Sequence, residues 1–191
     1  MTKYIKKNFK IFENNFPVFL NKNIFEPNLT TKLLIKSASK MINKNDKVLD
    51  LGCGSGIIGC YFYKKKIISS IYASDISKAA INSTIYNAKK LTNNYDIRLS
   101  DSLDEWKDEK FDLIINDVSG ISSKINDISS WFKFAPNDSG KDGIKFTLNI
   151  LNKYKNNISA KGKLIFPVLG LSNRNKLINF LKKNKIDYKI L

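Results

Sequence analysis

Short apolar runs alternate with longer amphipathic segments along most of the chain. The short runs are rich in β-branched residues and end in polar ones, which is typical of buried strands, whereas the longer segments have the apolar spacing of helices. We predict strands at 47–51, 70–74, 96–99, 111–116 and 163–168, and a strand-like last segment at 187–191. We predict helices near 28–43, 56–65, 77–91, 141–157 and 173–184.

This alternation predicts an α/β fold, because a strand followed by a helix and a second strand forms a right-handed crossover. Repeated crossovers give a doubly wound, mostly parallel sheet with helices on both faces. We find no internal repeat and no linker that divides the 191 residues, so we expect a single domain.

The N-terminal residues 1–27 have a different pattern, with many aromatic residues. Phe9, Phe12, Phe16 and Phe19 have helical spacing, which favours a short amphipathic arm packed on the core. The alternative is a lid over a substrate site. We therefore divide the chain into an N-terminal arm or lid at 1–27 and the main domain at 28–191.

The chain is strongly basic, with a formal net charge of +16, but 31 of its 33 basic residues are lysine. Such a field attracts phosphates or acidic surfaces. Dedicated nucleic-acid sites generally use arginine for bidentate contacts, so nucleic-acid binding stays open at this point.

The absence of histidine removes the commonest general base and metal ligand, and two cysteines cannot form a zinc site alone. We therefore predict no metal. Neither a disulfide framework nor an apolar run of about 18 residues is present, so we expect a cytoplasmic protein with no membrane segment.

Polar residues follow four consecutive predicted strands. Ligands of open parallel sheets bind beyond the carboxyl ends of the strands, so these residues are candidates for a binding site. They are Asp50 with the glycine turn after it, Asp75, Asp101 with Ser102, and Asn116 with Asp117.

The turn after the first of these strands has glycine at every second position, at Gly52, Gly54 and Gly56. Glycine allows a sharp turn and a close approach of a nucleotide-like ligand. The spacing Gly54-x-Gly56-x-x-Gly59 also matches a dinucleotide fingerprint. That match begins too late, because the strand has ended by residue 51, and it gives no reason for Asp50 or Asp101.

The stretch Val48-Leu-Asp-Leu-Gly-Cys-Gly-Ser-Gly56 resembles the glycine motif of class I methyltransferases that use S-adenosylmethionine (SAM). Within this class the chain resembles the small methyltransferase domain group, which includes release-factor glutamine and ribosomal-protein L11 methyltransferases and several RNA methyltransferases. The resemblance runs from about residue 25 to residue 168 and includes Gly140-Lys-Asp-Gly143. It implies a Rossmann-like methyltransferase sheet.

The resemblance also implies roles for the candidate residues. Asp50 would bind the amino group of SAM directly or through water, and Gly52, Cys53, Gly54 and Gly56 would lie along its methionine part. Asp75 would accept hydrogen bonds from the ribose hydroxyls. Ile76 would flank the adenine, and Asp101, beside Ser102, would accept from its amine.

The loop after the fourth strand departs from the group's Asn-Pro-Pro-Tyr motif, since it reads Asn116-Asp117-Val118-Ser119. Asn116 keeps an acceptor, but the two prolines are missing. The aromatic platform is missing too, unless Trp131, Phe132 or Phe134 replaces the tyrosine. Asp117 either orients or deprotonates the acceptor, or caps a helix without a chemical role. We take Asn116 and Asp117 as the candidate catalytic residues.

The function predicted from the sequence is SAM-dependent methyl transfer to a nitrogen in a protein side chain or RNA base. Two alternatives remain open: a small-molecule N- or O-methyltransferase, and a non-catalytic SAM-binding scaffold. The group's sheet has seven strands, so this chain either lacks the last one or pairs that edge with its N-terminal arm or a second subunit. If a second subunit pairs with that edge, the protein is a homodimer.

Overall fold

A parallel sheet of five strands forms the centre of the protein, in the order β5-β4-β3-β6-β7. The structure is a computed structural model that describes residues 3–22, 24–128 and 137–191. The strands are β3 (Val48–Leu51), β4 (Ile71–Asp75), β5 (Tyr95–Leu99), β6 (Phe111–Asn116) and β7 (Ile158–Ile165).

The chain starts the sheet in the middle, at β3, and moves outward through β4 to β5. It then crosses back to β6 and continues outward to β7. The direction of winding therefore reverses between β3 and β6. In doubly wound sheets this is the point where ligands bind, beyond the carboxyl ends of the strands.

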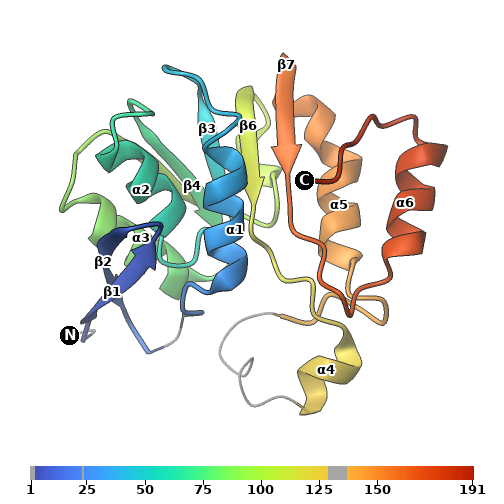
Figure 1. The fold of residues 1–191 in the computed structure, drawn as a ribbon, viewed down its shortest axis with the longest axis horizontal. Coiled ribbons are helices and arrows are strands. Elements are labelled where there is room, and N and C mark those ends of the chain that lie inside the picture. The colour runs from blue at the N-terminus through green and yellow to red at the C-terminus, as the bar shows by residue number, and fades with distance from the viewer. Residues whose placement is uncertain (1–2, 23, 129–136) are drawn as a thin grey trace.

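Helices cover both faces of the sheet, as the sequence predicts (Figure 1). Residues of α1 (Leu29–Ala38), α2 (Ile57–Lys64) and α3 (Lys78–Ala88) share one core cluster with Val48 and Ile115. On the other face, η1 (Asp104–Trp106) and α5 (Lys145–Lys153) pack on Leu49 and Ile114, and α6 (Arg174–Lys183) packs on α5. The described residues also form two short elements, α4 (Ser123–Ile128) and η3 (Tyr154–Asn156).

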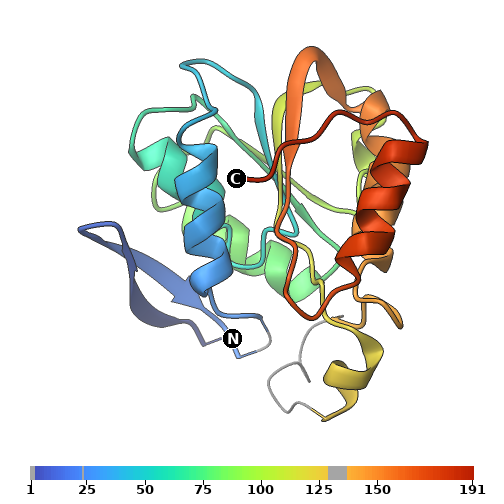
Figure 2. The same cartoon turned by 45° about the vertical axis from the view of Figure 1, so that its right-hand side comes forward.

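The prediction for the N-terminal segment is wrong in its secondary structure. Residues 5–20 form an antiparallel hairpin of β1 (Ile5–Ile11) and β2 (Asn14–Leu20), which lies beside α1 and α3 (Figures 1 and 2). Phe16, Val18 and Leu20 are buried, so β2 follows a period of two. Pro17 between them lacks the N–H that a helix interior needs, and this overrides the helical spacing of the phenylalanines.

The predicted last strand at 187–191 is also wrong, since no strand forms there. Tyr188, Ile190 and Leu191 are exposed, and this segment pairs with none of the described strands. An apolar, strand-like sequence does not become a strand without a partner that satisfies its backbone.

The other predicted elements are present with shifted ends. The strand predicted at 163–168 begins earlier, at Ile158, and the helix predicted at 141–157 begins later, at Lys145. The positive φ of Gly140 and Gly143 explains the late start, because both residues form a left-handed turn before α5. Among the described helices, the longest has 11 residues, and none has the length and apolar character that crossing a membrane requires.

Candidate functional site

A cavity of about 330 Å³ lies at the carboxyl ends of the central strands, where the winding of the sheet reverses. Four strand ends and the segment before α1 form most of its wall, and α5 adds Phe146 and Ile150. The main lining segments are 24–28, 51–55, 75–77, 100–102 and 117–121. The cavity therefore joins four strand ends named by the sequence with the segment 24–28, which supplied none of the candidate site residues.

The glycine turn after β3 is held in the left-handed region, with φ of 74° at Gly52 and 54° at Gly54. A Cβ on Gly52 would come within 2.9 Å of Val118 Cγ1 in the next loop. A Cβ on Gly54 would meet only the carbonyl oxygen of Phe25, at 4.0 Å. Gly52 is thus required for close packing, whereas Gly54 leaves open space in the cavity wall.

Gly56 lies outside the cavity wall, at the start of α2. A Cβ there would come within 2.5 Å of Thr84 Cγ2, so its role is close packing between α2 and α3. Cys53 is buried in the wall, with its Sγ 3.2 Å from Thr84 Oγ1. Burial raises the pKa of the Cys53 thiol, so the group is neutral.

Asp75 at the end of β4 is fixed by two backbone amides. Its Oδ2 accepts a hydrogen bond from Gly54 N at 3.0 Å, and its Oδ1 accepts one from Ser77 N at 2.8 Å. Burial raises the pKa of the Asp75 carboxyl, and these two amides oppose the rise. The carboxylate is therefore oriented within the cavity wall, where the exposed Ile76 follows it.

Asp101 and Ser102 after β5 also line the cavity. Ser102 has a left-handed φ of 54°. Its hydroxyl donates to Asp101 Oδ1 at 3.1 Å and accepts from Asn149 Nδ2 of α5 at 2.9 Å. This connection through Ser102 holds the loop after β5 against α5.

Asp50 lies behind the glycine turn and not in the cavity wall. Its Oδ2 accepts a hydrogen bond from Gly59 N at 3.1 Å, and its Oδ1 has no partner among the described residues. Burial, with smaller contributions from Asp117 and Asp75, raises the pKa of this carboxyl well above its usual range.

The two candidate catalytic residues after β6 lie in different places. Asn116 is buried outside the wall; its Oδ1 accepts from Val118 N at 3.1 Å, and its Nδ2 has no partner among the described residues. Asp117 lines the cavity, and its Oδ2 accepts a hydrogen bond from Thr31 Oγ1 at 3.0 Å. Burial raises the pKa of Asp117 to about 7, although the Thr31 bond opposes this.

Thr31 is a site residue that the sequence analysis missed. It belongs to the first turn of α1, where it forms a capping box with Asn28. The capping box could be recognised from the sequence, but the contact with Asp117 joins residues 86 positions apart and has no local pattern. Phe25, which is 39% exposed in the wall, was missed for the same reason.

The predicted replacements for the aromatic platform, Trp131, Phe132 and Phe134, lie outside the described residues. Within the described residues, no three side chains of cysteine, aspartate and glutamate come together in a way that could hold a metal ion. The chemistry available in the described wall therefore comes from carboxylates, hydroxyls and backbone amides.

Comparison with known proteins gives a family match at residues 12–117, to the model of the methyltransferase small domain. A release factor glutamine methyltransferase of Borreliella burgdorferi is 33% identical over 156 residues, which cover 76% of this chain and 53% of that protein. A ribosomal protein L11 methyltransferase of Thermosipho melanesiensis is 40% identical over 89 residues, which cover 47% of this chain and 34% of that protein. The chain thus spans about half or less of the length of these two curated relatives.

A solved structure has the same fold. The ribosomal protein L11 methylase from Lactobacillus delbrueckii subsp. bulgaricus superposes with a TM-score of 0.67 over 90% of this chain and 78% of that one. The two sequences are 22% identical, so this similarity concerns the fold. It agrees with the five-stranded parallel sheet and its helices described above.

Proposed function

The chain belongs to the methyltransferase small domain family, and on that basis we propose that its cavity binds SAM and directs the methyl group to a nitrogen of a protein side chain or RNA base. One observation carries the proposal. A single cavity contains a carboxylate tied to the glycine turn, Asp75, and a second carboxyl group with a pKa of about 7, Asp117.

The cavity fits SAM in size and in the chemistry of its wall. Each oxygen of the Asp75 carboxylate accepts one amide hydrogen bond and has capacity for a second, as two ribose hydroxyls require. Asp101 supplies a further acceptor for an amine. Gly54 leaves room for a ligand to lie against the backbone, and a volume of about 330 Å³ is in the usual range of small-molecule sites.

We assign the binding roles on this basis. Asp75 holds the ribose, Ile76 covers one face of the adenine, and Asp101 with Ser102 accepts from the adenine amine. Gly52, Cys53 and Gly54 lie along the methionine part. Asp50 is buried behind the turn, so we assign its contact with the amino group to a bridging water on Oδ1, which has no partner among the described residues.

When bound, SAM supplies a methyl group on a positively charged sulfur, which leaves with the bonding electrons as a neutral thioether. The chain's own task is to align the acceptor with that methyl group and to handle the acceptor's proton. Asp117 accepts a hydrogen bond from the acceptor nitrogen and takes up its proton as the new bond forms. A pKa near 7 suits this role, since the ionised form is then abundant at neutral pH and still basic.

Asn116 has a different role in this proposal. Its side chain is buried, and its Oδ1 accepts from Val118 N, so it holds the loop that carries Asp117. The backbone carbonyl of the next residue, Asp117, remains a candidate acceptor for the substrate amine.

A small molecule with an amine or hydroxyl group is the second candidate acceptor. The observation that favours it is Asp117 itself, because a carboxylate beside the acceptor can deprotonate a hydroxyl as well as orient an amine.

The test is methyl transfer from radiolabelled SAM into an extract of the source cells, divided into RNA, protein and small-molecule fractions. We expect label in the RNA or protein fraction, and at least about tenfold less label with Asp117→Asn. Label in the small-molecule fraction alone would support the second candidate. No label with folded protein that still binds S-adenosylhomocysteine would identify a non-catalytic scaffold.

We also propose that the chain works in the cytoplasm. Cys53 and Cys60 are both buried and unpaired, and burial raises the pKa of both thiols. Unpaired thiols are typical of a reducing compartment.

A further inference from the structure

Positive charge is distributed unevenly along the chain. Residues 1–95 contain 16 lysines, no arginine and only five acidic residues. Among those five, Asp50 is buried and Asp75 is tied to backbone amides. In the described residues, only Lys7 and Lys47 of the 16 lysines form salt bridges. Residues 1–95, which include the hairpin and the helices α1–α3, therefore carry most of the net positive charge.

Lysines from two helices lie against rings of the hairpin. Lys32 Nζ of α1 lies 4.9 Å from the ring centroid of Phe9, and Lys64 Nζ of α2 lies 5.4 Å from that of Phe16. Phe9 and Phe16 are paired across the hairpin. The ring of Phe16 also contacts that of Tyr61, with centroids 5.8 Å apart.

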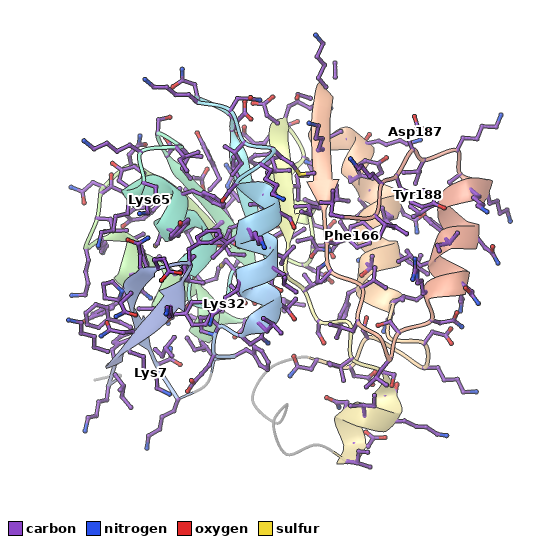
Figure 3. All side chains as sticks on the ribbon, in the orientation of Figure 1. Lys7, Lys32, Lys65, Phe166, Asp187 and Tyr188 are labelled. Atoms are coloured by element: carbon purple, nitrogen blue, oxygen red, sulfur yellow. The ribbon has the colours of Figure 1, made fainter. Side chains whose placement is uncertain are left out.

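Two more lysines extend this surface. Lys65 Nζ lies 5.9 Å from the ring centroid of Tyr61, and Lys36 is exposed one turn after Lys32 in α1. Figure 3 shows Lys7, Lys32 and Lys65 in the same half of the molecule, with the hairpin, α1 and α2. We name this surface the hairpin face and define it as Lys7, Lys32, Lys36, Lys64 and Lys65.

The hairpin face reaches the rim of the cavity through one ion pair. Lys7 Nζ of β1 pairs with Glu26 Oε1, and Glu26 belongs to the cavity wall. Phe25, beside Glu26, is 39% exposed in the same wall. A polyanion on the hairpin face would therefore end at the opening of the cavity and compete with Glu26 for Lys7.

We propose that the hairpin face binds the phosphate backbone of an RNA strand and brings one of its bases to the cavity. This rests on the proposed function, because RNA is one of its two acceptor classes. Lysine ammonium groups bind phosphates as point charges, without reading the sequence. Lysines together with exposed rings such as Phe12 and Phe25 form the combination that binds single-stranded RNA.

The test is the affinity for a fluorescein-labelled single-stranded RNA of 20 nucleotides, measured by anisotropy from 50 to 300 mM salt without SAM. We expect Lys32→Gln/Lys36→Gln/Lys65→Gln to weaken binding at least about tenfold and to lower the slope of log Kd against log salt by about 2. Glu26→Gln removes the competitor of Lys7 and tightens binding.

The matched control is Lys182→Gln/Lys183→Gln/Lys185→Gln. It makes the same change in net charge at the end of α6 and beyond, at the side of the molecule opposite the hairpin (Figures 1 and 2). We expect less than about a twofold effect on Kd. Because Lys32 also packs on Phe9, the double variant Lys36→Gln/Lys65→Gln serves if the triple variant melts early.

Equal losses in both triple variants would overturn the proposal, since net charge alone would then explain binding. Displacement of the RNA by poly-L-glutamate at equal charge concentration would also overturn it in favour of an acidic protein partner. Binding of S-adenosylhomocysteine is measured in parallel. If the protein binds S-adenosylhomocysteine but not RNA, only the proposed RNA surface is overturned. If it does not bind S-adenosylhomocysteine, the proposed function is contradicted.

Discussion

The carboxyl group of Asp117 connects the loop after β6 with the first turn of α1, through its hydrogen bond with Thr31 Oγ1. It is a cavity-lining carboxyl whose pKa lies near neutrality, at about 7. It therefore changes charge within the range in which an enzyme is assayed, and both stability and activity should record that change.

The stability of the fold should fall as pH rises through this range. The ordinary pKa of the group is 3.8 and its folded value is about 7, so between about pH 4 and 7 the folded chain binds more protons than the unfolded one. The pKa values of Asp50 and Asp75 are raised too and give the same sign. We expect Asp117→Asn to reduce, without removing, the fall in Tm between pH 5 and 8. An unchanged slope would contradict the assignment.

Catalytic activity should rise with pH over the same range in which stability falls. If ionised Asp117 takes the acceptor's proton, kcat/KM rises with pH through a midpoint near 7 and levels off above it. Thr31→Val removes the hydroxyl that favours the ionised form, so we expect the midpoint to move upward in a pH–rate profile. Thr30→Val, which alters a neighbouring hydroxyl without a bond to Asp117, serves as the control.

Alanine substitutions at two glycines of the turn should affect ligand affinity and fold stability to different extents. Gly54→Ala places a Cβ in open space in the wall, so we expect about 1–2 kcal/mol of instability from the left-handed φ and a larger loss of S-adenosylhomocysteine affinity. Gly56→Ala adds an overlap with Thr84, and we expect about 2–5 kcal/mol of instability. Urea denaturation with calorimetric titration distinguishes the two, and equal stability losses would contradict this account.

Among the elements, the parallel strands were predictable because each is a short β-branched run that ends in a polar residue. The hairpin was not, since Phe9, Phe12, Phe16 and Phe19 have helical spacing by coincidence, and among these residues only Pro17 disfavours a helix. The last predicted strand failed because pairing depends on a neighbour that no local sequence specifies. The outer edge of β7 carries Lys161 and Lys163, and a homodimer through that edge stays a prediction.

One side chain of α3, Asn87, makes two hydrogen bonds to the backbone of the hairpin. Asn87 Oδ1 accepts from Phe19 N, and its Nδ2 contacts the carbonyl oxygens of Phe19, Ser55 and Ser83. Asn87→Ala leaves these backbone groups without that partner, so we expect a loss of about 2–3 kcal/mol in urea denaturation. Asn94→Ala, whose Nδ2 makes one exposed bond to Ser69 O, should cost less than about 1 kcal/mol.

The candidate site was predicted in part. The strand ends named Asp75, Asp101, Ser102 and Asp117, and the resemblance added Ile76. All five lie in the cavity wall because parallel strands end at one edge of the sheet. Thr31 and Phe25 could not be found this way, since the chain returns to the cavity at the start of α1. Nor did the sequence show that Asp50 and Asn116 are buried outside the wall.

For the whole molecule, the uneven charge has a thermodynamic consequence. A formal charge of +16 with most lysines of residues 1–95 unpaired implies self-repulsion in the folded state, which salt screens. We expect Tm to rise between 20 and 300 mM sodium chloride, and to rise less in Lys32→Gln/Lys36→Gln/Lys65→Gln. A Tm that falls with salt would mean that attractive ion pairs dominate the surface.

Whether this cavity binds SAM is tested most directly by a calorimetric titration of the protein with S-adenosylhomocysteine. We expect binding of one ligand per chain, weakened about 10- to 100-fold in Asp75→Asn and unchanged in Asp127→Asn, an exposed carboxylate on α4. No heat and no thermal shift with folded protein, or equal affinity in Asp75→Asn, would contradict the assignment of this cavity to SAM.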